Sequence, residues 1–169
     1  HLQTVGLCWY DGEHREGNMI RVRPFHSSDF GLLLELANQA VPFAPEGNEE
    51  WLKYRKSFDE TRFFRYHCIA EENGEATGYG CLEQQSDDPG WLRIFLVCHP
   101  EKLGGAVGTK LFDHLLEKAK MTPATNLWAR EYQRDRAAEK FFKEHGFEEV
   151  NRFELRDELP MVVYALKIV

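Results

Sequence analysis

The stretch that decides the fold is WLRIFLVCHPEKLGGAVGTKLFDHLL, residues 91–116. It begins with an apolar run of strand length, residues 94–98, which stops before Pro100. A turn with three glycines follows, and from there apolar residues recur at the spacing of one helix face: Val107, Leu111, Leu115 and Ala119. The sequence therefore predicts a strand, a glycine-rich turn and a helix whose first turn contains the glycines.

A glycine-rich turn at the start of a helix can bind phosphate. The first backbone N–H groups of a helix have no intrahelical partner, the helix dipole is positive there, and glycine lets a ligand approach the backbone closely. The alternative is that the turn only connects the strand to the helix. A P-loop is excluded because Thr109 separates Gly108 from Lys110, and a dinucleotide fingerprint is excluded because no G-x-G occurs.

The same residues resemble the acetyl-CoA-binding motif of the GNAT family of N-acetyltransferases. In that family a strand ending in V-x-P leads through a turn of the form [QR]-x-x-G-x-[GA] into a helix. Here Pro100 and Gly108 match the pattern, whereas Cys98, Leu103 and Ala106 stand in place of Val, of Gln or Arg, and of Gly. Ala106 costs little if it is already helical. Leu103 lacks a guanidinium that could bind phosphate, so the resemblance implies weaker cofactor binding.

The length of 169 residues, 43% of them hydrophobic, suits one compact domain. Patterning predicts the order strand, helix, helix, three strands, helix, strand, helix, two strands, which resembles the GNAT domain over residues 19–169. Residues 1–18 form an extension or linker of unknown role. The resemblance implies an α/β (α+β) acyl-CoA N-acyltransferase fold. Its mixed, mostly antiparallel sheet has about seven strands and about four flanking helices, with a splayed parallel pair at the cofactor site.

Local signals fix several element ends. Ser27 or Ser28 is expected to cap the first helix, and Asn73-Gly74 predicts a tight hairpin turn. The strand after the glycine-turn helix is expected to span residues 126–130. Gly146 is expected to end the last helix.

The net charge of −7 argues against nucleic acid or an anionic membrane as the main partner. It suits a cationic substrate such as an amine, although solubility alone also explains it. No apolar run reaches the roughly 18 residues of a membrane span and no leader is recognisable, so a cytoplasmic protein is expected. The cysteines form no C-x-x-C pair, which favours buried free thiols over disulfides or a metal site. They are Cys8, Cys68, Cys81 and Cys98.

The resemblance assigns acetyl-CoA contacts to three groups of residues. In the strand before the turn, a bulge and the splay expose backbone atoms of Leu96, Val97 and Cys98, which contribute contacts. The turn and helix start contribute Leu103, Gly104, Gly105, Ala106, Val107, Gly108 and Thr109. The segment RDRAAEKFFKEHGF is similar to the family's closing N-x-x-A-x-x-x-Y-x-x-x-G-F and contributes Asp135, in place of Asn, and Phe142, in place of Tyr.

Acyl transfer to an amine requires a base, because a lysine-like amine with a pKa near 10.4 is almost wholly protonated at pH 7. Glu83, at the end of the third predicted strand, and Glu131, just past residues 126–130, are the candidates. A solvated carboxylate is the alternative for each. Phe142 cannot protonate the leaving thiolate, so Tyr132 or water is expected to do so. Cys98 is not expected to act as a covalent nucleophile, because no base is adjacent in the sequence.

The acceptor site is covered, in the family, by the loop and helix after the first helix. This position implies Phe43, Trp51 and Tyr54 as lining residues, with plain core packing as the alternative. The leading hypothesis is an acetyl-CoA-dependent N-acetyltransferase that acts directly on a primary amine of a small molecule or protein. The alternatives are a non-catalytic acyl-CoA-binding sensor or scaffold of the same fold, and an unrelated α/β binding domain. The resemblance also leaves a homodimer open.

Overall fold

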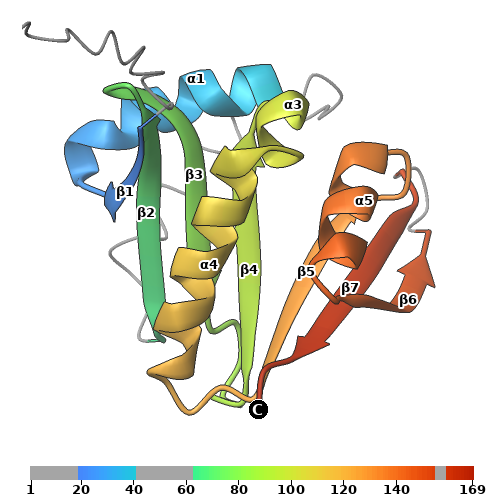
Figure 1. The fold of residues 1–169 in the computed structure, drawn as a ribbon. Helices are drawn as coiled ribbons and strands as arrows, with labels where there is room; N and C mark the ends of the chain where they lie inside the picture. The colour runs from blue at the N-terminus through green and yellow to red at the C-terminus, as the bar shows by residue number, and fades with distance from the viewer. Residues whose placement is uncertain (1–18, 41–62, 155–158) are drawn as a thin grey trace, which may run out of the picture.

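The computed structural model describes residues 19–40, 63–154 and 159–169. Seven strands form one sheet in the order β1-β2-β3-β4-β5-β7-β6, in which only β4 and β5 are parallel neighbours (Figure 1). The mixed, mostly antiparallel sheet is therefore confirmed. The strands are β1 Ile20–Pro24, β2 Arg65–Glu72, β3 Glu75–Glu83, β4 Trp91–Cys98, β5 Asn126–Tyr132, β6 Glu148–Phe153 and β7 Met161–Lys167.

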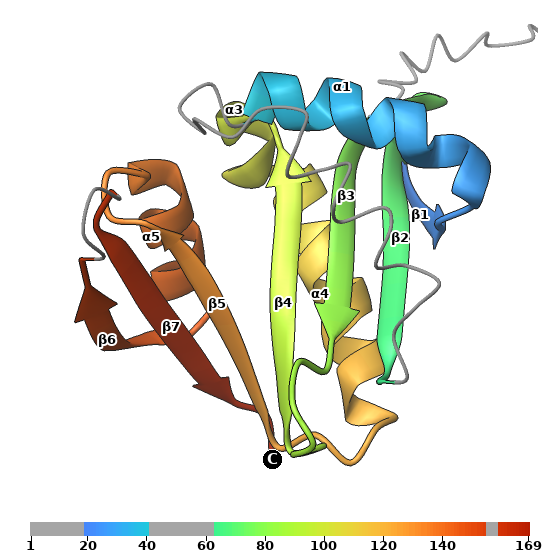
Figure 2. The same ribbon diagram turned by 180° about the vertical axis from the view of Figure 1, so that it is seen from behind.

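Helices cover both faces of the sheet. α1 lies on one face, and α4 and α5 lie on the other (Figures 1 and 2). The helical elements of the described ranges are η1 Ser27–Asp29, α1 Phe30–Ala40, α3 Pro100–Leu103, α4 Ala106–Lys120 and α5 Arg136–Glu144. The helix expected near residues 48–58 lies outside the described residues.

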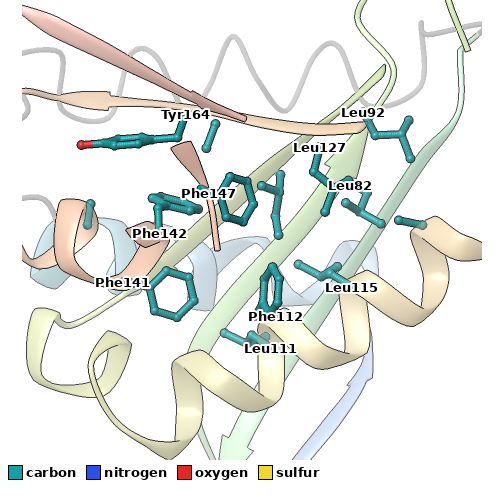
Figure 3. Close-up of a cluster of buried hydrophobic side chains, with 14 of the residues drawn as sticks. Leu82, Leu92, Leu111, Phe112, Leu115, Leu127, Phe141, Phe142, Phe147 and Tyr164 are labelled. Carbon is teal, nitrogen blue, oxygen red and sulfur yellow. The ribbon is translucent and has the colours of Figure 1, made fainter. Parts of the chain in front are cut away.

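α4 packs closely on β3 because two glycines face it. A Cβ atom on Gly78 would lie 2.8 Å from Cδ1 of Leu111, and one on Gly80 would lie 2.8 Å from Cδ1 of Leu115. The predicted apolar face of this helix is confirmed, since its residues belong to the main core shown in Figure 3. The sequence thus fixes both the helix and the strand surface that receives it.

α5 ends as the sequence predicts. Gly146 adopts a φ of +88°. The N–H of Gly146 donates to the carbonyl of Lys143 at 3.1 Å, and the N–H of Phe147 donates to that of Phe142 at 2.9 Å. These two bonds form a Schellman motif. The ring centroids of Phe142 and Phe147 lie 5.0 Å apart, which anchors the chain reversal in the core (Figure 3).

The β2–β3 hairpin is also confirmed. Asn73 and Gly74 have φ values of 53° and 84°, as a type I′ turn requires. The predicted serine cap of the first helix is wrong, because His26 occupies the N-cap position of η1. Its N–H donates to the Asp29 carboxylate at 2.8 Å. The acid three residues after the cap satisfies this amide, so no serine is needed.

β5 is longer than expected. It continues through Glu131 and Tyr132, which pair with Val162 and Met161 of β7. Both residues were expected just beyond the strand, and that expectation is wrong. Pairing with β7, which lies near the other end of the chain, extends β5. The residues around 131 and 132 give no local sequence signal for this pairing.

Cys68, Cys81 and Cys98 are buried free thiols, as expected, and Cys8 lies outside the described residues. In residues 19–40, 63–154 and 159–169 no His, Cys, Asp and Glu side chains gather in a group of three that could hold a metal ion. None of the helices in these ranges has the length and apolarity needed to cross a membrane.

Candidate active site

The parallel strands β4 and β5 separate after a short ladder. Their pairing runs from Trp91 and Asn126 to Arg93 and Trp128, and beyond this point the strands diverge (Figure 2). Among the described residues, the edge of β4 that faces β5 therefore has no strand partner along residues 94–98. In a strand, every second residue directs its N–H and C=O toward a given side, so this edge offers main-chain groups to a ligand.

The bulge expected in β4 is absent, because its register with β3 is continuous from Arg93–Glu83 to Cys98–Gly78. β4 keeps its ladder with β3 and β5 keeps its ladder with β7, so the two strands separate without an extra residue. Leu96 packs toward the main core and Val97 packs beneath α1. The side chains of both residues are engaged in packing, so only their backbones could reach a cofactor, and that contact stays a prediction.

The turn at the open end of β4 consists of two helix ends. Gly104 donates its N–H to the carbonyl of Pro100, and Gly105 donates to that of Lys102, both at 3.2 Å. These amides end α3. The N–H groups of both glycines are therefore used within the turn, and the expected contact of these residues with the cofactor stays a prediction.

The amides at the start of α4 remain for a ligand. Gly105 is the N-cap and carries no capping side chain, and the N–H of Thr109 donates to its carbonyl at 3.4 Å. The amides of Ala106, Val107 and Gly108 precede this bond, at the positions where a helix has no internal acceptors. Together with the positive end of the helix dipole, these amides have the donors and the polarity that an anion requires, and their contact with a cofactor stays a prediction.

The departures from the family pattern are small in structural terms. Ala106 is the first residue of α4 and is exposed, so it needs no glycine. The Leu103 side chain packs partly buried against the core. Gly108 is the position that cannot change, because a Cβ atom there would lie 2.0 Å from the carbonyl oxygen of Leu103.

Glu131 lies on β5 across the gap from β4. Burial, and secondarily the carboxylate of Asp135, raise the pKa of Glu131 to about 8, although Arg93 and Arg130 act in the opposite direction. Asp135 itself caps α5 by accepting the N–H of Ala138 at 3.0 Å. Glu131 is therefore a carboxyl that exchanges protons near neutral pH, which suits a general base.

Cys98 is buried at the open end of β4, with 6% of its surface exposed. Burial, and secondarily the charge of Asp135, raise the pKa of its thiol to about 12. A neutral, buried thiol is a poor nucleophile, in agreement with the sequence-based expectation.

Glu83 does not have the free carboxylate that a base requires. It is 6% exposed and lies 3.3 Å from Nη2 of Arg65 and 3.7 Å from Nη1 of Arg93. It also accepts a hydrogen bond from Nε2 of Gln85 at 2.7 Å. The register of three strands surrounds Glu83 with cations, which makes Glu131 the better candidate, and the role of Glu83 as a base stays a prediction.

Phe142, expected at the cofactor, lies in the core, and its contact with the cofactor stays a prediction. It is 1% exposed, and its ring stacks on Tyr164 with centroids 5.6 Å apart (Figure 3). Tyr132 is half-buried at the end of β5, with the guanidinium of Arg134 5.7 Å from its ring centroid. Its role as an acid stays a prediction. The predicted acceptor-lining residues Phe43, Trp51 and Tyr54 lie outside the described residues.

Sequence reasoning missed Arg93 and Trp128. They form the last pair of the β4–β5 ladder. Through the register, a row runs across four strands on the α1 face of the sheet: Arg65, Glu83, Arg93 and Trp128. Charged residues in separate strands cannot be predicted to lie side by side until the pairing register of the strands is known.

Comparison with known proteins gives the family. The Acetyltransferase (GNAT) family matches residues 31–147. The chain belongs to this family. No curated protein is similar enough in sequence to count as a relative of this GNAT protein.

Solved structures show the same fold at low sequence identity. The protein yncA from Salmonella typhimurium, solved with its cofactor acetyl-CoA, has a TM-score of 0.68 and 17% identity, over 90% of this chain and 95% of that chain. The ribosomal-protein-S18-alanine N-acetyltransferase from Escherichia coli has a TM-score of 0.69 and 16% identity, over 89% and 94%. The spermidine/spermine N-acetyltransferase SpeG from Vibrio cholerae has a TM-score of 0.64 and 14% identity, over 88% and 92%.

Proposed function

We propose that this GNAT protein is an N-acetyltransferase that moves an acetyl group from acetyl-CoA directly to a primary amine. One observation carries the proposal. The β4–β5 ladder ends at Arg93 and Trp128, and the edge of β4 that is left unpaired leads directly toward the amides of α4. Membership in an acetyltransferase family supports the reaction type. The similar fold of a protein solved with its cofactor acetyl-CoA supports the choice of cofactor.

The residues present fit acetyl-CoA at two places. The amides of Ala106, Val107 and Gly108 would hold its pyrophosphate, since they are the orphan donors of a helix start. The unpaired edge of β4 along residues 94–98 would hold the amide-rich pantetheine arm by main-chain hydrogen bonds. Asp135, which caps α5 near Cys98 and Glu131, would border the arm on the other side.

Acetyl-CoA supplies an acyl group activated as a thioester. Glu131 would take one proton from the acceptor ammonium. The neutral amine nitrogen would then bond to the carbonyl carbon, the carbon–sulfur bond would break, and the nitrogen would release its second proton to water. A pKa of about 8 allows Glu131 to hold this proton and to release it to solvent near neutral pH. The leaving thiolate takes its proton from Tyr132 or from water, because Phe142 has none to give.

The acceptor is an amine of a small molecule or of a protein. Both acceptor classes stay in the proposal because proteins of similar structure are named for each. One is named for an alanine of ribosomal protein S18 and another for spermidine and spermine. The proposal also places the protein in the cytoplasm, where acetyl-CoA is available, and leaves it free to form a homodimer.

Acetyl-CoA binding is tested by the thermal midpoint of the purified protein with and without millimolar acetyl-CoA. A ligand at 100 times its Kd adds about 2.7 kcal/mol to the free energy of unfolding, so a clear upward shift is expected. Ala106→Asp should reduce the shift, because an acid at the helix start stabilises the free protein and repels phosphate. Ala106→Ser is the matched control and should keep the shift.

Turnover is tested next by release of the CoA thiol with a panel of amines. Acetylation of at least one amine supports the enzyme. A protein that binds acetyl-CoA but acetylates no amine would instead be the non-catalytic acyl-CoA-binding module. Absence of any acetyl-CoA shift would contradict both functions.

A further inference from the structure

We propose that Arg93 binds a carboxylate of the acceptor, so that the preferred acceptors are amines that carry a carboxylate at some distance from the amino group. This inference rests on the proposed function and names the substrate class of the same site.

The position of Arg93 places it beside the opened strand edge. It pairs with Trp128 at the last step of the β4–β5 ladder. Its neighbours Leu92 and Ile94 belong to the core beneath α4, so by strand alternation Arg93 lies on the opposite face of the sheet. The amides of α4 would hold the cofactor on the α4 face of the sheet. An acceptor that reaches the open edge of β4 from the α1 face would meet Arg93.

The guanidinium of Arg93 is held in place but poorly neutralised. Its Cζ lies 5.2 Å from the ring centroid of Phe95 and 5.6 Å from that of Trp128, so aromatic contacts fix the group. Its Nε is buried and has no hydrogen-bond partner in the part of the chain that the structure describes. The distance from Nη1 to the Glu83 carboxylate is 3.7 Å, too long for a hydrogen bond.

Glu83 cannot neutralise Arg93 alone, because its other oxygen lies closer to Arg65, at 3.3 Å. Gln85 also donates to the carboxylate at 2.7 Å. Arg93 and Arg65 thus share the carboxylate of Glu83, and neither ion-pair distance is that of a short, strong hydrogen bond. A carboxylate from the acceptor would give Arg93 the close partner that Glu83, at 3.7 Å, does not, because the planar fork of a guanidinium matches a carboxylate with two hydrogen bonds. The 17% exposure of the Arg93 side chain leaves part of it within reach of a ligand.

The geometry also sets the length of the acceptor. Successive strand residues rise by about 3.3 Å, so the middle of the open edge lies roughly 7–13 Å along β4 from Arg93. An ω-amino acid with several methylene groups spans this distance, whereas glycine does not.

The experiment compares amine pairs that differ by one carboxylate, namely 6-aminohexanoate with pentylamine and 4-aminobutyrate with propylamine. We expect the wild type to favour the acids in kcat/KM by about 10- to 100-fold, the range of a charge-assisted hydrogen bond. Arg93→Gln should abolish this preference mainly through KM for the acids, and Arg93→Lys should restore part of it. Arg152→Gln, a half-exposed arginine on the edge strand β6 outside this row, is the matched control and should keep the preference.

A preference that is absent in the wild type, or that survives in Arg93→Gln, would overturn the inference. The proposed function would still stand if the plain amines were acetylated. If Arg93→Gln does not fold, the wild type alone decides, because hexanoate should inhibit competitively against the amine at far lower concentration than hexanamide. If no amine is turned over, 6-aminohexanoate should still raise the thermal midpoint of the CoA-bound protein more than pentylamine does. Equal shifts would contradict the inference.

Discussion

The carbonyl oxygen of Leu103 occupies the place where a side chain at Gly108 would begin. A Cβ atom on Gly108 would lie 2.0 Å from this oxygen and 2.8 Å from the carbonyl carbon. The Leu103 side chain packs against the core, so its carbonyl cannot move away freely. The contact joins the end of α3 to the first turn of α4 and thereby orients the amides that would bind phosphate.

Gly108→Ala is therefore expected to destabilise the protein by about 1–3 kcal/mol, the usual cost of a forced backbone shift. It should also weaken binding of acetyl-CoA, because the start of α4 must move. Gly104→Ala is the matched control, since the nearest atom to a Cβ there is 3.8 Å away. Thermal midpoints with and without acetyl-CoA measure both effects. Equal losses in the two variants would show that the contact at Gly108 does not control the turn.

Glu131→Gln is expected to lower kcat/KM by about 10²- to 10⁴-fold, the usual contribution of a general base. In the wild type, kcat/KM should rise with pH and level off above about 8, where the Glu131 carboxyl is ionised. The variant should lose this rise. A pH–rate profile for one acceptor measures it, and a variant that kept the same rise would exclude Glu131 as the base.

Glu131 should also make the stability of the protein depend on pH. Its pKa in the folded state, about 8, is above the ordinary value of 4.5. The folded state then binds more protons than the unfolded state between these values, so stability is fully present below pH 4.5 and falls as pH rises through 8. Urea unfolding from pH 5.5 to 8.5 should show the decline in the wild type and a flatter curve in Glu131→Gln. Parallel curves would contradict a raised pKa.

The parts of the fold that the sequence predicts are those with local causes. The turn at Asn73-Gly74 and the helix end at Gly146 require positive φ, which few residues tolerate. The strand, turn and helix around Gly108 follow from periodicity and from a glycine whose neighbour leaves no room. Such signals are complete within a few residues and need no knowledge of the sheet.

The candidate site was predicted less fully because its chemistry depends on register. From the sequence alone Glu83 is a reasonable candidate base, and only its ion pairs with Arg65 and Arg93 in the structure show that cations surround it. Phe142 aligns with a functional tyrosine in sequence, but Tyr164 from β7 stacks on it in the core. Glu131 is a candidate from the sequence because the family resemblance implies the splay of β4 and β5, and its role as a base stays a prediction.

Cys98→Val is expected to leave turnover within about twofold of the wild type, because the thiol is buried and residue 98 would contact the cofactor through its backbone. Burial and Asp135 raise the pKa of Cys98 to about 12, so the thiol should also resist iodoacetamide at pH 8 in the folded protein. Peptide mapping after labelling, with and without urea, measures its reactivity. Rapid labelling of Cys98 in the native state, or loss of turnover in Cys98→Val, would revive a nucleophilic role.

Phe142→Tyr restores the tyrosine of the family pattern and tests whether this position can reach a cofactor. The ring is 1% exposed and lies among Phe141, Phe147 and Tyr164, so an added hydroxyl would be buried in an apolar cluster. We expect a loss of about 1–3 kcal/mol in the free energy of unfolding and no gain in kcat. Phe153→Tyr, at the half-buried end of the edge strand β6, should change stability little and is the control. An unchanged thermal midpoint together with a higher kcat would mean that the side chain at residue 142 faces the leaving thiolate.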